Sequence, residues 1–158
     1  MISLGDEIFN SMKRYNSMCA LKIGSRQISY DELNNKALSI AGFLSNHGMV
    51  HRNVGIVTQR SFSAYAGILG AIYAGCAYVP INPKYSKERI VDIVKQAEIE
   101  VLVADESDWE ETREKIKDLY GLKYVLFPED GQVFSENTPI GVSESQLANF
   151  EILSGPLK

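Results

Sequence analysis

From residue 50 onward, the chain alternates between short apolar runs and longer segments whose apolar side chains recur at helical spacing. The apolar runs carry no charge, which is typical of strands buried on both faces of a sheet. Ser61 and Ser86 precede two of the longer segments and are suited to cap helices. The pattern predicts strands at 54–57, 76–79, 101–104 and 124–127, and helices at 62–74, 87–97 and 107–120.

Strands that alternate with helices over short connections are joined by right-handed crossovers and form parallel sheets. We therefore expect an α/β fold in three layers, with a mainly parallel sheet flanked by helices. Trp109, Ile116 and Leu119 should face inward from the last helix. The other side chains expected in the core are Leu33, Ala37, Ile40, Leu44, Val54, Ile56, Ile68, Leu69, Ile72, Val79, Ile90, Ile93, Val94, Leu102 and Leu126.

The residues before this alternation predict a helix, a hairpin and a second helix. Apolar residues recur at helical spacing over 3–15, and two extended runs flank Gly24-Ser25-Arg26, a hairpin signal. Ser29 and Glu32 have the spacing of a capping box, in which Glu32 reaches back to the Ser29 amide. The helix that opens there is expected to end at Gly48, which can adopt a left-handed conformation.

No charged residue occurs between Arg60 and Lys84. A stretch of this length suits a transmembrane helix, but three glycines thin its hydrophobicity, and Pro80 and Pro83 end any helix. A buried helix followed by a buried strand explains the stretch better. We therefore expect residues 62–81 in the interior and no membrane association.

Composition adds limits on the class of protein. The chain has 158 residues, 45% of them hydrophobic and 23% charged, which fits a single globular domain. A net charge of −4 gives no basic field to attract nucleic acid. Cys19 and Cys76 are far apart in apolar surroundings, so two buried, reduced thiols are expected rather than a disulfide or zinc site. The acidic N-terminus has no signal-peptide pattern, and a cytoplasmic location is expected.

Phosphate-binding motifs are the first chemistry to seek in an α/β fold. The sequence contains neither G-x-x-x-x-G-K-[ST] nor G-x-G-x-x-G after a strand. Arg60 and Ser61 sit where a strand gives way to a helix, a corner that can hold an anion. A solvated arginine beside a capping serine is the favoured interpretation. Asp105 alone follows the strand at 101–104, so a carboxylate cluster for a metal-dependent phosphoacceptor is not predicted.

Histidine chemistry has equally little support. His47 and His51 are four residues apart, but Gly48 lies between them and no acid or cysteine joins them, so two surface histidines are expected. No G-x-S-x-G elbow occurs. No residue is therefore assigned a catalytic, cofactor-binding or metal-binding role.

Two stretches carry a family resemblance. Residues 28–33, with the sequence ISYDEL, resemble the L-[TS]-Y-x-E-L signature of adenylate-forming enzymes, the AMP-dependent synthetase/ligase superfamily. Residues 70–83, GAIYAGCAYVPINP, resemble the family's next signature, L-K-A-G-x-A-Y-V-P-I-D-P, and residues 85–90, YSKERI, resemble the Y-P-x-E-R-I that follows. These motifs are most similar to those of the amino-acid-activating domains of nonribosomal peptide synthetases and of D-alanine–carrier-protein ligases.

The resemblance implies an activity in which a carboxylate and ATP form an acyl-adenylate that is passed to a thiol. ATP and magnesium are the cofactors that it implies for the full-length family. The family's phosphate loop, T-S-G-[ST]-T-G-x-P-K-G, is absent from this sequence, as are the later motifs. Tyr73, Cys76 and Asn82 stand where lysine, glycine and aspartate are usual.

Residues 1–158 are therefore expected to form a single partial domain, an N-terminal fragment of such a ligase that is inactive and binds no cofactor alone. Residues 1–127 match the family's N-terminal subdomain, and 128–158 are expected to be irregular, with weak helix potential at 143–150. The expected partners are the missing C-terminal part of the ligase or a second copy of this chain. A carrier protein is a further candidate partner. An alternative is a stand-alone, non-catalytic module that docks onto a partner ligase or carrier protein. An unrelated flavodoxin-like nucleotide binder is disfavoured, because residues 59–61 offer no phosphate-binding loop.

Overall fold

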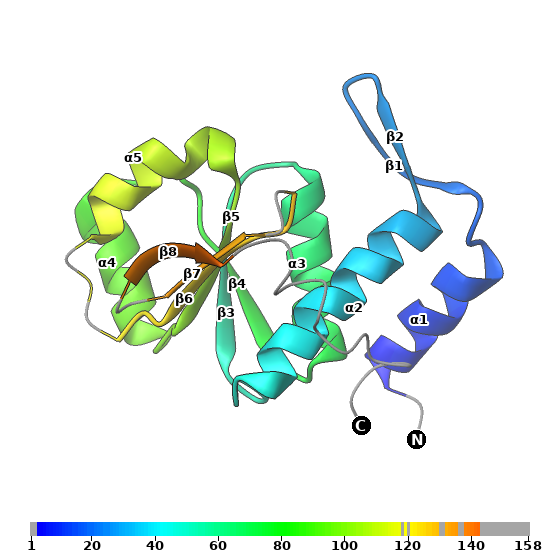
Figure 1. Ribbon diagram of the computed structural model, residues 1–158, viewed down its shortest axis with the longest axis horizontal. Helices are drawn as coiled ribbons and strands as arrows, with labels where there is room; N and C mark the ends of the chain where they lie inside the picture. The colour runs from blue at the N-terminus through cyan, green and yellow to red at the C-terminus, as the bar shows by residue number, and fades with distance from the viewer. Residues whose placement is uncertain (1–2, 118, 120, 130–131, 136–137, 143–158) are drawn as a thin grey trace.

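The computed structural model describes residues 3–117, 119, 121–129, 132–135 and 138–142. Its main sheet has six strands in the order β4-β3-β5-β6-β7-β8, and the first four are parallel (Figure 1). The parallel strands and the helices between them are β3 (Asn53–Val57), α3 (Phe62–Tyr73), β4 (Ala77–Pro80), α4 (Lys87–Gln96), β5 (Val101–Ala104), α5 (Glu106–Ile116) and β6 (Tyr124–Phe127). The predicted α/β fold is confirmed, although α5 ends at Ile116 rather than at residue 120.

Two antiparallel strands extend the sheet beyond β6. They are β7 (Gln132–Ser135) and β8 (Thr138–Val142). The expectation of an irregular segment from residue 128 onward is wrong for these residues. Each run is too short to predict a strand by itself, and the backbone hydrogen bonds come from pairing of β7 with β6 and of β8 with β7. The helix expected weakly at 143–150 lies outside the described residues.

The N-terminal elements form as predicted and lie to one side of the sheet (Figure 1). They are α1 (Leu4–Arg14), the antiparallel hairpin of β1 (Cys19–Ile23) and β2 (Arg26–Ser29), and α2 (Tyr30–Asn46). The Ser29 hydroxyl accepts from the Glu32 amide at 3.1 Å, which fixes the start of α2. Gly48 follows α2 with a φ of +69°, a left-handed conformation that favours glycine, as expected.

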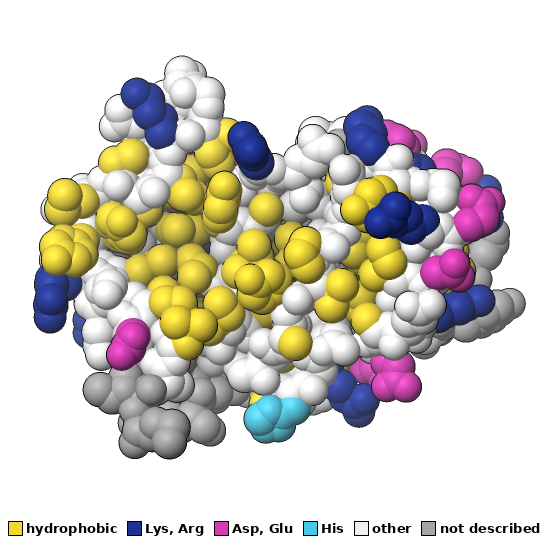
Figure 2. Space-filling model, turned by 180° about the vertical axis from the view of Figure 1, so that it is seen from behind, with side chains coloured by type: hydrophobic (Ala, Val, Ile, Leu, Met, Phe, Trp, Pro, Cys, Tyr) yellow, Lys and Arg dark blue, Asp and Glu magenta, His cyan; other side chains and the backbone are white. Residues whose placement is uncertain are grey.

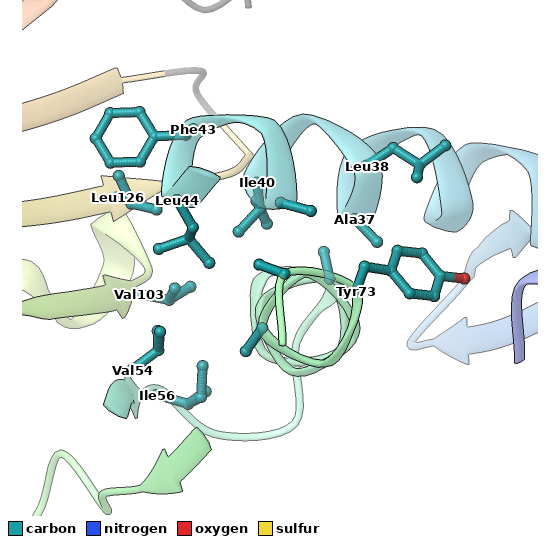
Figure 3. Close-up of a cluster of buried hydrophobic side chains, with 14 of the residues drawn as sticks. Ala37, Leu38, Ile40, Phe43, Leu44, Val54, Ile56, Tyr73, Val103 and Leu126 are labelled. Carbon is teal, nitrogen blue, oxygen red and sulfur yellow. The ribbon is translucent and has the colours of Figure 1, made fainter. Parts of the chain in front are cut away.

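Alternate strand residues feed two separate apolar clusters, one on each face of the sheet. Val54 and Ile56 of β3 and Val103 of β5 join the cluster covered by α1, α2 and α3 (Figure 3). Val57 and Leu102 join the second cluster, with Ile90 and Val94 of α4. Trp109, Ile116 and Leu119 also lie against this second cluster, which confirms their predicted inward orientation. The sheet is therefore sandwiched between two helical layers.

Most of the predicted core is buried, with Leu44, Val54 and Leu102 at 0% exposure. The prediction is wrong for five side chains that are only half-buried, namely Ile68, Leu69, Ile72, Val79 and Ile93. It also fails for β4, where Tyr78 is 42% exposed. In the described sheet β4 has a neighbouring strand on one side only, so residues 62–81 are not wholly interior.

Several fully buried side chains were not predicted from the sequence, and Tyr73 is the largest of them. Its hydroxyl donates to Asn34 Oδ1 at 2.8 Å, and its ring meets Phe9 edge-on with 6.1 Å between centroids. Tyr73 therefore ties α3 to both α1 and α2. Among the described helices, none combines the length and apolarity needed to cross a membrane.

Candidate functional site

The carboxyl ends of β3 and β5 form the point where the sheet's winding reverses. After β3 the chain turns to β4 on one side, and after β4 it crosses back to β5 on the other side. In open α/β sheets, ligands bind in the crevice at such a point. The residues that follow these strands are therefore the first candidates for a site.

Thr58 and Asp105 meet in this crevice although 47 positions separate them. The Thr58 hydroxyl donates a hydrogen bond to Asp105 Oδ2 and lies 3.1 Å from Ser61 Oγ. Ser61 in turn accepts from the Ala64 amide at 3.1 Å and caps α3. The carboxylate thus holds the loop between β3 and α3 in place, and the capping role favoured for Ser61 is confirmed.

A shallow pocket of about 490 Å³ lies beside this network. It is lined by Thr58, Gln59, Arg60, Pro80, Ile81, Asn82 and Tyr85. Gln59 Nε2 donates to Asn82 Oδ1 at 3.2 Å, and the same oxygen accepts from the Lys84 amide at 2.9 Å. Sequence reasoning proposed Arg60 and Ser61 as the corner but did not connect Asn82 or Tyr85 with it.

The chemistry available in this pocket is limited to a contact with an anion through Arg60. A magnesium–triphosphate complex requires a cradle of backbone amides and a carboxylate for the metal. Of the described residues, none that lines the pocket carries a carboxylate, and the Ser61 hydroxyl is engaged by its own helix. The residues present therefore do not fit the triphosphate.

The two histidines follow α2 and differ in their surroundings. The His47 ring stacks on Phe43 with 4.0 Å between centroids, and His47 Nδ1 lies 2.9 Å from the Phe43 carbonyl oxygen. His51 is exposed and has a φ of 64°. Within the described part of the chain, no group of three or more metal-ligating side chains converges. The expectation of two surface histidines is therefore wrong for His47, which is half-buried because its ring covers Phe43.

The cysteines differ from each other. Cys19 is exposed on β1, so the prediction of two buried thiols is wrong for this residue. Cys76 is half-buried, and its thiol donates to the Met49 carbonyl oxygen at 3.1 Å. Burial raises the pKa of the Cys76 thiol, which disfavours the reactive thiolate. Both are free, as expected.

A second cavity, of about 510 Å³, lies between the hairpin, α2 and the start of α3. At its edge Arg26 donates to Glu32 at 2.8 Å and to Glu129 at 2.7 Å, and its guanidinium lies 5.0 Å from the Phe62 ring centroid. Hydrogen bonds to Glu129, and then to Glu32, raise the pKa of Arg26. Glu32 is thus paired with Arg26, and the reciprocal contact to the Ser29 amide that the sequence predicted is not part of the α2 cap.

The complete capping box of the N-terminal region lies instead on α1. Ser3 Oγ accepts from the Asp6 amide at 3.1 Å, and Asp6 Oδ2 accepts from the Ser3 amide at 3.1 Å. Sequence reasoning missed this box because aspartate, rather than glutamate or glutamine, holds the third helical position. Its effect is to fix the start of α1.

Both signature stretches occupy structural positions. In residues 28–33, Ile28 is fully buried and Ser29 caps α2. In residues 70–83, an added Cβ at Gly70 would lie 2.6 Å from Ile40 Cγ2 and 3.0 Å from the Ala37 carbonyl oxygen, so α2 and α3 approach closely there. Gly75 has a φ of +71° in the turn that leads into β4. These stretches form helix starts, helix contacts and turns.

Comparison with known proteins identifies the family. The model of the AMP-binding enzyme family matches residues 8–146, and the chain belongs to this family. One mycosubtilin synthase polypeptide, from Bacillus subtilis, is 38% identical over 132 residues, which is 82% of this chain and 4% of that protein. Bacitracin synthase 1 of Bacillus licheniformis is 44% identical over 86 residues, which is 54% of this chain and 2% of that protein.

A solved structure agrees with this assignment. The crystal structure of IdnL7 superposes with a TM-score of 0.77 at 29% identity, and the match covers 98% of this chain and 30% of IdnL7. The chain therefore spans a small fraction of these relatives and has the fold of one part of the AMP-binding enzymes.

Proposed function

We propose that this chain is the N-terminal portion of an amino-acid-activating ligase, of the type that forms an acyl-adenylate from a carboxylate and ATP and passes the acyl group to a thiol. The observation that carries the proposal is the family match over residues 8–146, together with 38% identity to a mycosubtilin synthase polypeptide. The two signature stretches, residues 28–33 and 70–83, agree with this assignment, because both lie within the matched residues.

The role proposed for this portion is structural support. Its signature residues cap α2, bring α2 and α3 into contact and turn the chain into β4. Among the described residues that line the pocket beside Thr58, Arg60 is the one cation and none is a carboxylate, which supports a structural role over ATP binding. In the proposed enzyme, we therefore expect other residues than those described here to hold ATP, magnesium and the substrate carboxylate.

Pyrophosphate exchange driven by amino acids tests this proposal. The isolated chain should show background exchange with every amino acid and no saturable heat with ATP and magnesium at millimolar concentration. A fusion of residues 1–158 to the unmatched remainder of IdnL7 should show exchange above background for at least one amino acid. Exchange by the isolated chain would contradict the proposal that this portion has a structural role and does not hold ATP. A soluble, folded fusion that never exchanges would contradict the ligase assignment.

A further inference from the structure

Asp105 is the one acidic side chain that the described part of the molecule buries, at 9% exposure. Figure 2 shows other acidic side chains at the surface, several of them beside lysine or arginine side chains. Among the described residues, no lysine, arginine or histidine forms an ion pair with Asp105. A buried charge is normally paired with an opposite charge or bound to a metal ion, so a carboxylate in this position favours a bound cation.

The hydrogen bonds of Asp105 leave one of its two oxygens available. Asp105 stands at the N-cap of α5, where an aspartate usually accepts from an amide of the first turn, but its side chain makes no such bond. Its Oδ2 accepts from the Thr58 hydroxyl instead. Since a carboxylate can accept several hydrogen bonds, Oδ1 is able to take a further ligand. Thr58 therefore orients the carboxylate without satisfying it.

Ser63 is a second buried polar group whose ligand is not provided by the described residues. Its side chain is 0% exposed, and its Oγ has no hydrogen-bond partner among them. A buried hydroxyl without a hydrogen bond costs free energy. In a native protein, such a group is commonly explained by a bound water or ion.

The period of the strand and the pitch of the helix bring Ser63 and Asp105 to the same corner. Asp105 follows Val103 by two positions, so its side chain points to the same face of the sheet, which α3 covers. On that face an added Cβ at Gly67 would lie 2.9 Å from Val103 Cγ1. Ser63 lies one turn before Gly67, and helical side chains lean toward the start of their helix. Ser63 is thus directed toward the carboxyl end of β5, where Asp105 stands.

We propose that Asp105 and Ser63 bind a monovalent metal cation, sodium or potassium, in the corner between the end of β5 and the start of α3. Carboxylate and hydroxyl oxygens suit hard cations rather than zinc or copper. One carboxylate neutralises one positive charge. In the described part of the chain no three His, Cys, Asp or Glu side chains converge, which disfavours a divalent ion. Thr58 acts as a positioning residue, because it holds Oδ2 and leaves Oδ1 for the ion.

The bound cation connects three segments that are distant in sequence. They are the loop after β3, the first turn of α3 and the start of α5, which carry Thr58, Ser63 and Asp105. Only the folded chain brings these residues together. The cation should therefore stabilise the folded state in proportion to its concentration above the dissociation constant.

Thermal unfolding of residues 1–158 in three chloride salts of equal ionic strength tests this site. The cations are sodium, potassium and N-methyl-D-glucamine, which is too large for the corner. Sodium or potassium should raise the unfolding midpoint by about 3 °C or more, with saturation, relative to the organic cation. Asp105→Asn should abolish this difference, and Ser63→Ala should move its saturation to higher salt. Asp92→Asn is the matched control, because Asp92 is an exposed carboxylate on α4.

Equal midpoints in the three salts would overturn the proposal, as would a cation-specific difference that Asp105→Asn retains. A Ser63→Ala variant that is more stable than the wild type in every salt, with no cation-specific difference in either chain, would show that the hydroxyl meets only water or a void. Sodium-23 relaxation of the wild-type chain, with potassium as competitor, gives a measurement that needs no variant. Sodium that relaxes as fast with this chain as with Asp92→Asn, and more slowly with Ser63→Ala, supports the site, whereas no enhancement by the wild type contradicts it.

Discussion

The two helical layers of this fold are built on different principles. α2 buries nine of its residues, because the sheet, α1 and α3 surround it, whereas α4 buries only Ile90 and Val94. The outer surface of this layer instead carries ion pairs, such as those of Glu111 on α5 with Lys84, in the loop before α4, at 3.0 Å and with Lys115 at 3.1 Å. The α2–α3 layer therefore depends on close apolar contact, and the α4–α5 layer is a solvated cover with one apolar stripe.

The two layers also differ in the polarity of their outer sides. A layer that faces water needs polar residues on its outer side, and α4 and α5 have them. The α2–α3 layer has such residues on parts of α2 but none on α3. Substitutions in the two layers should therefore differ in cost, and four tests follow in order of the expected effect.

The largest loss is expected for Leu44→Ala. Leu44 is fully buried in the cluster between α2 and the sheet, so its removal leaves a cavity and should lower the free energy of unfolding by about 2 to 5 kcal/mol. Ile93→Ala on α4 is the matched comparison and should lose less, because Ile93 is half-buried. Chemical denaturation gives both values. An unchanged midpoint for Leu44→Ala would contradict its place in the core.

Gly70→Ala should come next. Its Cβ would lie 2.6 Å from Ile40 Cγ2, 2.7 Å from Ile40 Cβ and 3.0 Å from the Ala37 carbonyl oxygen, so α2 and α3 must separate. Overpacking outweighs the helix propensity gained, for a net loss of about 2 kcal/mol.

Gly67→Ala sharpens the same test. The nearest atoms to its Cβ would be side-chain methyl carbons, Val103 Cγ1 at 2.9 Å and Ile56 Cδ1 at 3.1 Å, which can shift more easily than a backbone. Thermal unfolding should therefore rank Gly67→Ala as milder than Gly70→Ala. The reverse order would mean that the contact between α2 and α3 is looser than the structure shows.

Tyr73→Phe should cost about 1 to 2 kcal/mol, because the buried Asn34 Oδ1 loses its donor. Burial raises the pKa of the Tyr73 phenol, so the folded state holds this proton more tightly than the unfolded state does. The stabilisation is therefore complete below the ordinary value of 10.0 and declines as the pH rises above it. Tyr73→Phe should weaken this alkaline decline, as chemical denaturation at a series of pH values measures.

The smallest effect is expected for Glu111→Gln in the α4–α5 layer. Hydrogen bonds from Lys84 and then Lys115 lower the pKa of Glu111 below its ordinary value of 4.5. The contribution is thus present above that value and is lost as the pH falls below it. Because the group is exposed, the change in unfolding midpoint should be small and should shrink in high salt. Glu110→Gln, an exposed neighbour on α5, provides the control, and a larger effect than for Tyr73→Phe would contradict the comparison.

Much of the fold follows from local signals. Ser29, Ser61 and Ser86 each start a helix by accepting an amide hydrogen bond within their own segment, and such contacts need no distant partner. The strands β5 and β6 are recognisable because each is a short apolar run that adjoins a helical segment. The family was also assigned from local sequence motifs, at residues 28–33 and 70–83. The family match confirms that assignment.

The candidate site could be predicted from the sequence only in part. Arg60 and Ser61 are recognisable as a strand-to-helix corner, but the hydrogen bond from Thr58 to Asp105 joins two strands far apart in the sequence. The pairing of Arg26 with Glu129 spans 103 positions and had no sequence signal. Such contacts depend on strand order, which periodicity does not encode.

The sequence by itself determined the order of the elements from α1 to β6, the parallel α/β class and the membership of the AMP-binding family, because each rests on local patterns along the chain or on the order in which those patterns follow one another. Only the tertiary structure decided that β4 lies at an edge of the described sheet, that Tyr73 is buried between α1 and α2, and that α3 keeps one open side. An apolar residue has the same tendency to leave water wherever it occurs in the chain. Whether its side chain is buried depends on which surfaces are present to cover it, and those surfaces form only when the layers assemble.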